Sequence, residues 1–156
     1  MKIFVFSDSH GRGTLIVKAI RREAPDFVFF LGDGENDLKA LRQAFPALPF
    51  EAVRGNCDFR SQLPAELVCS VGGVRFFITH GHRYDVKTER TLESLKRAAR
   101  QAGAQVVLFG HTHEPYLEEE KGLILLNPGA AGSYGNPGYG VLELTDGQIL
   151  ARLETL

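Results

Sequence analysis

The sequence contains little cysteine, with only Cys57 and Cys69 among its 156 residues. Two cysteines at this spacing form neither a CxxC pair nor a disulfide framework. A protein that does not depend on disulfides suits a reducing compartment. We therefore expect a cytoplasmic protein.

Long hydrophobic runs and an excess of charge are also absent. The best apolar runs, Ile3–Phe6 and Phe27–Leu31, are far shorter than the roughly 20 residues that cross a bilayer. The apolar stretch after Met1 is likewise too short for a signal peptide. With 18 Lys and Arg against 19 Asp and Glu, the net charge is −1. Such a chain has no general attraction to anionic membranes or to long nucleic acid.

The length and the share of apolar residues predict one globular domain over residues 1–156. Hydrophobic residues make up 44% of the chain and charged residues 24%, which is ordinary for a protein with a packed core. In the first half, strand and helix patterns alternate, which predicts a parallel sheet with right-handed crossovers. The expected elements are strands at Lys2–Phe6, Phe27–Leu31 and Phe50–Val53 and helices at Thr14–Glu23 and Asn36–Phe45.

The second half is richer in strand patterns, and its clearest helix pattern covers Thr88–Ala102. Gly72-Gly73 and Asp146-Gly147 are typical of hairpin turns. The expected strands are Glu66–Val71, Val74–Thr79, Gln105–Phe109, Tyr116–Glu120, Leu123–Leu126, Val141–Thr145 and Gln148–Leu153. So many strands favour two packed, mixed sheets with helices on the outer faces, a four-layer αββα sandwich.

The glycine-rich segment Asn127–Gly140 is predicted to be a long loop. Loops of this length inside a compact domain often carry function.

The chemistry concentrates in short polar motifs that follow apolar runs. Each of five expected strands is followed by His, Asp or Asn, and sites in α/β sheets form beyond the carboxyl ends of strands. Any one of these residues alone is explained by a turn or by an ordinary structural histidine. Their coincidence indicates one metal site built from Asp8, His10, Asp33, Asn56, His80, His111 and His113.

Imidazole, carboxylate and amide donors without a required thiolate suit divalent transition metals. We expect manganese first, with nickel, zinc, iron and cobalt as alternatives. Seven candidate ligands exceed the needs of one ion, so two ions sharing a carboxylate fit better, as in centres that catalyse displacement at phosphorus.

In this order, the motifs D-x-H, G-D, G-N, H-G-H and G-H-T-H resemble the calcineurin-like metallophosphoesterase family, and the chain's size resembles that family's compact phosphodiesterases, the YfcE type. The resemblance implies a single metallophosphoesterase domain in which Asp33 bridges two ions. Asp8, His10 and His113 would complete one site. Asn56, His80 and His111 would complete the other.

The resemblance also implies a phosphodiesterase in which a metal-bridging hydroxide attacks phosphorus in line. Asp33, Asn56 and His82 are the predicted catalytic residues. Asn56 would touch a phosphate oxygen, and His82 would support the ligands or contact the substrate. A charge count ranks a small phosphodiester above a monoester, because two divalent ions, two carboxylates and a hydroxide leave one positive charge.

Two positions depart from the family pattern. Cys57 stands where many members carry a histidine that protonates the leaving group, and an ordinary thiol is a weaker proton donor at neutral pH. The sequence therefore predicts faster cleavage of aryl than of alkyl leaving groups. Ala130 stands where the family often has serine after Asn127-Pro128-Gly129.

The sequence leaves other functions open. A phosphomonoesterase or a small nuclease of the same family would use the same ligands. A retromer scaffold subunit shares the fold and works by binding proteins, although several of its ligand positions differ. The sequence does not specify the physiological substrate, the native metal or the oligomeric state, and a homodimer is one possibility.

Overall fold

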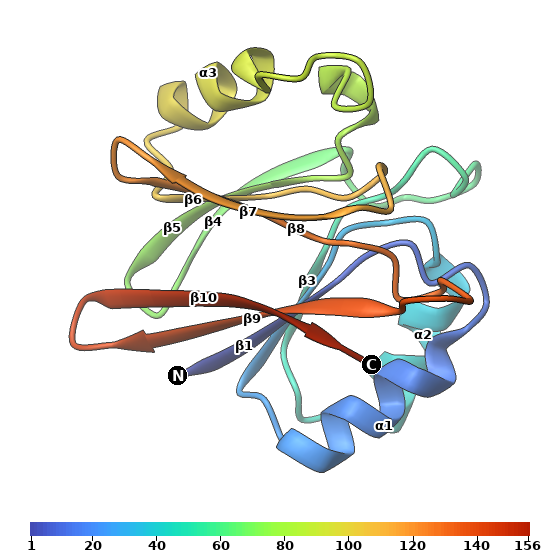
Figure 1. Cartoon of the computed structure of the whole chain (residues 1–156). Helices are drawn as coiled ribbons and strands as arrows, with labels where there is room; N and C mark the ends of the chain where they lie inside the picture. The colour runs from blue at the N-terminus through green and yellow to red at the C-terminus, as the bar shows by residue number, and fades with distance from the viewer.

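The computed structural model describes residues 1–156 and places two mixed β-sheets face to face, with helices on their outer sides (Figure 1). Each sheet has five strands, in the orders β10-β9-β1-β2-β3 and β4-β5-β6-β8-β7. This confirms the predicted α/β sandwich.

The first sheet is built around the parallel strands β1 (Lys2–Phe6), β2 (Phe27–Phe30) and β3 (Phe50–Ala52). The hairpin of β9 (Gly138–Thr145) and β10 (Gln148–Thr155) joins it with β9 antiparallel to β1. The crossovers between the parallel strands contain α1 (Gly13–Glu23) and α2 (Glu35–Ala44), which cover the outer face (Figure 1).

The second sheet begins with the hairpin of β4 (Glu66–Val71) and β5 (Val74–Thr79). A short 3₁₀ helix (His82–Tyr84) and α3 (Glu93–Gln101) lead to β6 (Val106–Leu108), which runs parallel to β5. The hairpin of β7 (Pro115–Glu120) and β8 (Leu123–Pro128) completes the sheet. None of the helices is both long and apolar enough to cross a membrane.

The alternation of side chains along the strands explains the layers. From β1, Ile3 and Val5 point between the two sheets, whereas Phe4 and Phe6 pack toward α1 and α2. Because both faces of β1 and β2 are covered, these strands read as continuous apolar runs. A third cluster, around Leu95, joins α3 to the second sheet.

The predicted helix over Thr88–Ala102 is wrong in its first turns, because α3 begins at Glu93. The preceding residue, Leu92, adopts a left-handed conformation with φ of 55° and is nevertheless buried. The Glu89 carboxylate accepts hydrogen bonds from the backbone N–H and the hydroxyl of Ser94, at 3.0 and 3.2 Å. Glu89 therefore supports the start of α3 from outside and is not part of it.

The glycine-rich segment is also shorter than predicted. Strand β8 continues through Asn127 to Pro128 and β9 begins at Gly138, so the loop covers residues 129–137. Hydrogen bonds from Ala131 N–H to Ser7 O (2.9 Å) and from Gly132 N–H to Asp8 O (3.0 Å) fix this loop against the end of β1.

Candidate metal centre

The carboxyl ends of strands from both sheets converge on one site. Asp8 and Asp33 follow β1 and β2, and Asn56 follows β3 in the first sheet. His80 follows β5 and His111 follows β6 in the second sheet. The predicted crevice beyond the strand ends is therefore formed between two sheets.

Asp8 is fully buried and has one carboxylate oxygen committed to the protein. Its Oδ2 accepts hydrogen bonds from the Ser7 hydroxyl at 2.5 Å and from the backbone N–H of His111 at 3.1 Å. Its Oδ1 is buried without a hydrogen-bond partner. A buried carboxylate oxygen left in this way is costly unless a cation or donor faces it.

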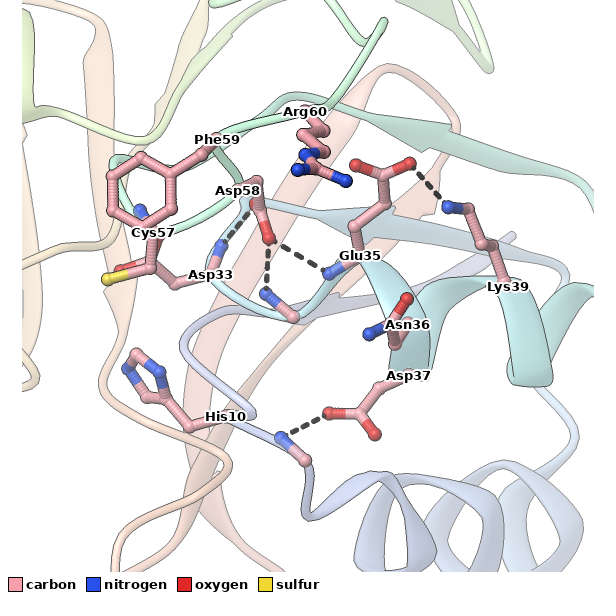
Figure 2. A pocket seen from close by; sticks show the side chains of 12 residues that line it. His10, Asp33, Glu35, Asn36, Asp37, Lys39, Cys57, Asp58, Phe59 and Arg60 are labelled. Carbon is pink, nitrogen blue, oxygen red and sulfur yellow. Dashed lines mark hydrogen bonds and ion pairs between the residues drawn. The ribbon is translucent and has the colours of Figure 1, made fainter.

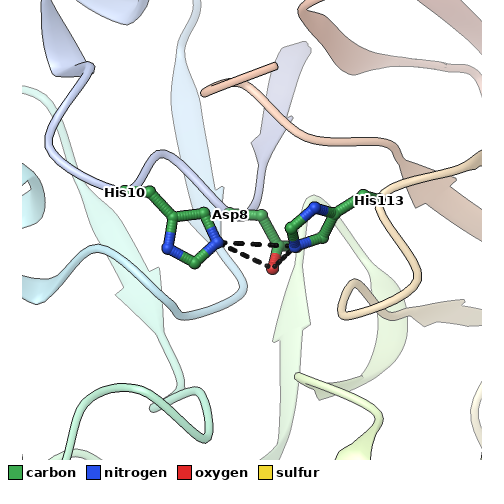
Figure 3. A group of neighbouring side chains, drawn as sticks. All are labelled: Asp8, His10 and His113. Atoms are coloured by element: carbon green, nitrogen blue, oxygen red, sulfur yellow. Dashed lines mark hydrogen bonds and ion pairs between the residues drawn. The ribbon is translucent and has the colours of Figure 1, made fainter. Parts of the chain in front are cut away.

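Two histidines place ring nitrogens beside this oxygen (Figure 3). His113 Nε2 lies 3.0 Å from Asp8 Oδ1, and His10 Nε2 lies 3.8 Å from it. The two Nε2 atoms are 3.4 Å apart. His113 Nε2 makes no hydrogen bond of acceptable geometry to Asp8 Oδ1, and the three atoms lie within 4.8 Å of one another, close enough to share a metal ion.

A second group of donors adjoins the first. His80 Nε2 lies 3.4 Å from Asp33 Oδ2 and 3.1 Å from Asn56 Oδ1. The other ring nitrogen of His80, Nδ1, lies 2.7 Å from the carbonyl oxygen of Leu31. A proton on Nδ1 would satisfy that carbonyl and leave the Nε2 lone pair free for a metal.

Asp8 and Asp33 connect the two groups. Asp8 Oδ1 lies 3.9 Å from His80 Nε2, and Asp8, Asp33 and His80 together form a cluster of possible ligands. Asp33 also forms such a cluster with His10 and Cys57. Asp33 thus reaches residues of both groups, as its predicted bridging role requires.

The charge states of Asp33 and His111 favour metal binding. Burial opposes ionisation of Asp33, but hydrogen bonds from His80 and from the Cys57 backbone hold the pKa of Asp33 well below its usual range. Burial, aided by the charges of His80 and Lys87, lowers the pKa of His111 to about 4. An ionised carboxylate and a neutral imidazole are the forms that bind metal.

The imidazole rings of His111 and His82 lie close to that of His80. The ring centroids of His80 and His111 are 5.0 Å apart, and those of His80 and His82 are 5.5 Å apart. His82 Nδ1 is buried without a hydrogen-bond partner, and burial lowers the pKa of this imidazole. The structure thus brings all the residues named from the sequence to one place, and their individual roles stay predictions.

The backbone at the candidate ligands is held in an uncommon conformation. Positive φ angles between 45° and 70° occur at Asp8, His10, Asp33, His111 and His113. Residues with a Cβ adopt this region at a cost, so the surrounding contacts must hold them there. These contacts include the hydrogen bonds from Asp8 N–H to Gly32 O (3.0 Å) and from His10 N–H to Asp33 O (3.1 Å).

Asp58, which follows the Gly-Asn motif, holds the Asp33 loop in place, a role that the sequence did not predict. Its carboxylate accepts hydrogen bonds from the backbone N–H groups of Asp33 (2.8 Å), Gly34 (3.2 Å), Glu35 (3.1 Å) and Gly55 (2.8 Å), several of which Figure 2 shows. Asp58 therefore joins the loop after β3 to the first turn of α2. The only sequence signal was its place at the end of the motif.

Other polar side chains fix the remaining loops. The Asp37 carboxylate accepts hydrogen bonds from the Ser9 hydroxyl (2.5 Å) and the Gly11 N–H (2.8 Å), which holds the loop that carries His10. The Asn127 side-chain amide donates to Gly110 O (3.0 Å) and Thr112 Oγ1 (2.9 Å) on the loop that carries His111 and His113. The motif containing Asn127 thus supports the site from β8.

The donor set fits divalent cations. The unpartnered Oδ1 of Asp8 lies beside two imidazole nitrogens, and the second group adds a carboxylate, an imidazole and an amide oxygen. Mixed nitrogen and oxygen donors of this kind suit transition metals. The fold and this site together are typical of metal-dependent hydrolases.

Comparison with known proteins identifies the family. The family model described as the calcineurin-like phosphoesterase superfamily domain matches residues 1–147, and the chain belongs to this family. The "Probable metallophosphoesterase YsnB" of Bacillus subtilis is 37% identical over 133 residues, which cover 83% of this chain and 75% of that protein.

Two further comparisons show the range of proteins that share the fold. The "Phosphodiesterase YfcE" of Escherichia coli K12 is 28% identical over 189 aligned positions, covering 98% of this chain and 97% of that protein. The crystal structure of Vps29 from Entamoeba histolytica in complex with Zn²⁺ superposes with a TM-score of 0.77 at 22% identity, and 99% of each chain is covered. The second likeness shows the fold alone.

Proposed function

We propose that this protein is a phosphodiesterase that depends on two divalent metal ions and acts on small phosphodiesters. The observation that carries the proposal is the convergence of two donor groups on the buried Asp8 and Asp33 carboxylates. Family membership and the printed name of the YfcE relative support phosphodiester hydrolysis.

The two groups would share Asp33. Asp8, His10 and His113 would complete the first site, and Asn56, His80 and His111 would complete the second. Bound there, the ions would supply Lewis-acid activation of the attacking water and neutralise charge at phosphorus. Manganese is our first expectation, because the donor set contains no thiolate that would favour softer metals.

The chain's own residues would position and orient the reactants. The bond between His80 Nδ1 and Leu31 O holds the imidazole with Nε2 facing the centre. Asn56 directs Oδ1 to the centre and leaves its Nδ2, which lies 3.4 Å from Cys57 Sγ, available to donate to a phosphate oxygen. The buried His80 would therefore hold the metal centre, and the exposed amide of Asn56 would contact the substrate.

The charge of the site favours a diester. Two divalent cations carry +4, the Asp8 and Asp33 carboxylates carry −2, and an attacking hydroxide carries −1. The remaining +1 matches a phosphodiester monoanion, whereas a monoester dianion leaves surplus negative charge.

The test is a metal reconstitution. The protein is stripped with a chelator, and Mn²⁺, Ni²⁺, Zn²⁺, Fe²⁺ or Mg²⁺ is added back singly. Hydrolysis of bis(p-nitrophenyl) phosphate is then compared with hydrolysis of p-nitrophenyl phosphate. We expect metal-dependent turnover that is faster with the diester.

Asp33→Asn and Asp146→Asn form a matched pair of variants for this assay. Both positions have positive φ, 55° and 49°, which asparagine tolerates, but Asp146 lies in the hairpin turn between β9 and β10. We expect Asp33→Asn to abolish turnover and Asp146→Asn to leave it unchanged. Metal binding without any turnover would support a binding protein instead.

A further inference from the structure

A pocket of about 570 Å³ opens directly beside the candidate metal centre (Figure 2). It shares His10 and Asp33 with the centre and extends over the first turn of α2 to residues 57–60. The Cys57 N–H donates to Asp33 Oδ1 at 2.7 Å, so the pocket wall is joined to the proposed bridging ligand. A phosphorus ester bound at the metals would therefore extend one of its arms into this space.

Phe59 is the unusual member of the pocket lining. Its residue surface is 88% exposed, and its ring contacts no other aromatic ring. Cys57 is the other apolar residue of the pocket lining, and Figure 2 labels both. An exposed aromatic face in a polar pocket is suited to stacking on a flat ring.

The backbone beside Phe59 is held by its neighbour Asp58. Asp58 is anchored by its hydrogen bonds to backbone N–H groups of the α2 start, and the Ser61 N–H donates to Asp58 O at 3.0 Å. The ring thus projects from an anchored turn. A backbone held in place before binding loses less entropy when a ligand arrives.

The charges of the pocket do not oppose a neutral ring. Glu35 is paired with Lys39 at 2.9 Å, and the carboxylates of Asp37 and Asp58 accept backbone and hydroxyl hydrogen bonds. Arg60, at the rim, has no ion pair. The pocket therefore presents one ion-paired acid and two hydrogen-bonded carboxylates around one apolar surface.

A protein-docking role explains Phe59 less well. The other exposed large hydrophobic residues are Met1, Val68, Leu117, Tyr134 and Leu150, and none of them lines this pocket. Protein interfaces usually need a contiguous apolar patch, and a single ring among charged groups is not one.

We infer that the Phe59 pocket is a subsite for a planar aromatic group on one ester arm of the substrate, so that aryl phosphodiesters are the preferred class. The inference rests on the proposed phosphodiesterase function. The ring face of Phe59 provides the stacking surface, while the metal centre fixes the phosphorus group.

The first test measures binding without catalysis. In benzylphosphonate a methylene replaces the ester oxygen, so the bond to the aromatic arm is not hydrolysed. Cyclohexylmethylphosphonate has the same charge and similar size but no flat ring. Titration calorimetry of the Mn²⁺-loaded protein should show tighter binding of benzylphosphonate by about five- to tenfold, as expected for one stacking contact.

Variants assign this preference to the ring. We expect Phe59→Leu to remove the preference and Phe59→Tyr to retain it. Tyr134→Leu is the matched control, because Tyr134 is 93% exposed but lies outside the pocket. Equal binding of the two phosphonates by the unaltered protein, or a preference that survives Phe59→Leu, would overturn the inference.

The second test measures turnover with diesters whose aryl and fluoroalkyl leaving groups have matched acidity. Phe59→Leu should raise KM about five- to tenfold for the aryl substrate only and leave kcat unchanged, because stacking is equal in the ground and transition states. Equal changes for both substrates would contradict the subsite. Ring-selective binding without any hydrolysis would retain the subsite and refute the phosphodiesterase function.

Discussion

The carboxylate of Asp58 accepts a hydrogen bond from the backbone N–H of Asp33, at 2.8 Å. The same Asp58 oxygen, Oδ2, also accepts the Gly55 N–H at 2.8 Å. The residue proposed to bridge two metals is therefore positioned by an acid that lies 25 residues away in the sequence. Residues that support metal ligands often affect metal affinity nearly as much as the ligands do.

Replacing Asp58 should weaken metal binding. Asp58→Asn keeps one acceptor oxygen but loses the negative charge that strengthens the hydrogen bonds. We expect the Mn²⁺ affinity to fall about 10- to 100-fold in a competition titration with a chromogenic chelator. Asp26→Asn is the control, since Asp26 accepts the Lys2 N–H at the start of β1, at the end of the strand remote from Asp8. An unchanged Mn²⁺ affinity in Asp58→Asn would show that the charged hydrogen bonds from Asp58 are not needed to position Asp33.

Cys57 should make the enzyme depend on the leaving group. Partial desolvation of the sulfur and the neighbouring Asp33 carboxylate raise the pKa of the Cys57 thiol to about 11, which makes it a poor proton donor at neutral pH. Cys57→His should increase kcat for an alkyl phosphodiester at least about tenfold and change kcat for an aryl diester much less. Cys57→Ser is the control. If Cys57→His accelerates both substrates equally, a lack of leaving-group protonation by Cys57 does not explain the dependence.

The loop over residues 129–137 should tolerate substitution at one glycine and not at another. A Cβ at Gly132 would lie 2.4 Å from the backbone oxygen of Ser9, which cannot move without displacing the loop that carries His10. A Cβ at Gly135 would meet nothing within 4 Å.

We therefore expect Gly132→Ala to lower the free energy of unfolding by about 1–3 kcal/mol in urea titrations and to weaken Mn²⁺ binding. Gly135→Ala should leave stability unchanged or raise it by up to about 1 kcal/mol. If Gly135→Ala destabilised the protein more than Gly132→Ala, the packing of this loop on Ser9 would not be what holds the loop in place.

Glu23 should stabilise the protein only when it is ionised. Its Oε1 accepts hydrogen bonds from Arg22 Nη2 at 2.7 Å and from the Tyr139 hydroxyl at 2.8 Å, and these contacts lower the pKa of Glu23. A carboxyl with a lowered pKa in the folded state contributes stability above its unfolded pKa of about 4.3 and loses it as the pH falls through the folded pKa.

The free energy of unfolding of Glu23→Gln should thus be about 0.5–1 kcal/mol below that of the unaltered protein at pH 7, and the difference should shrink toward pH 3. Glu119→Gln, at an exposed position, should show no such dependence. A difference that grows on acidification would mean that Glu23 is not stabilised as the carboxylate.

The sequence was sufficient to predict the layers and to place the candidate ligands at the strand ends, because both follow from short-range patterns. The apolar run Phe27–Leu31 predicted a strand covered on both faces, and Asp33 directly after it predicted a residue at the strand end. Parallel strands end at the same edge of a sheet, so their following residues meet without any knowledge of the loops.

Features that depend on long-range contacts were not predictable in this way. The helical pattern of Thr88–Ala102 includes Leu92, which is buried as the pattern requires but lies in a left-handed turn fixed by tertiary contacts. No sequence pattern signalled the roles of Asp58 and Phe59. Asp58 accepts a hydrogen bond from the backbone of a distant loop, and Phe59 exposes its ring to the pocket.

The central claim is that two cations bind where the two donor groups meet and that Asp33 contacts both. Crystals grown with Mn²⁺ and measured at the manganese absorption edge test it most directly. We predict two anomalous peaks, one among Asp8, His10 and His113 and the other among Asn56, His80 and His111, with the Asp33 carboxylate between them. A single peak, or peaks only at the molecular surface, would contradict the account.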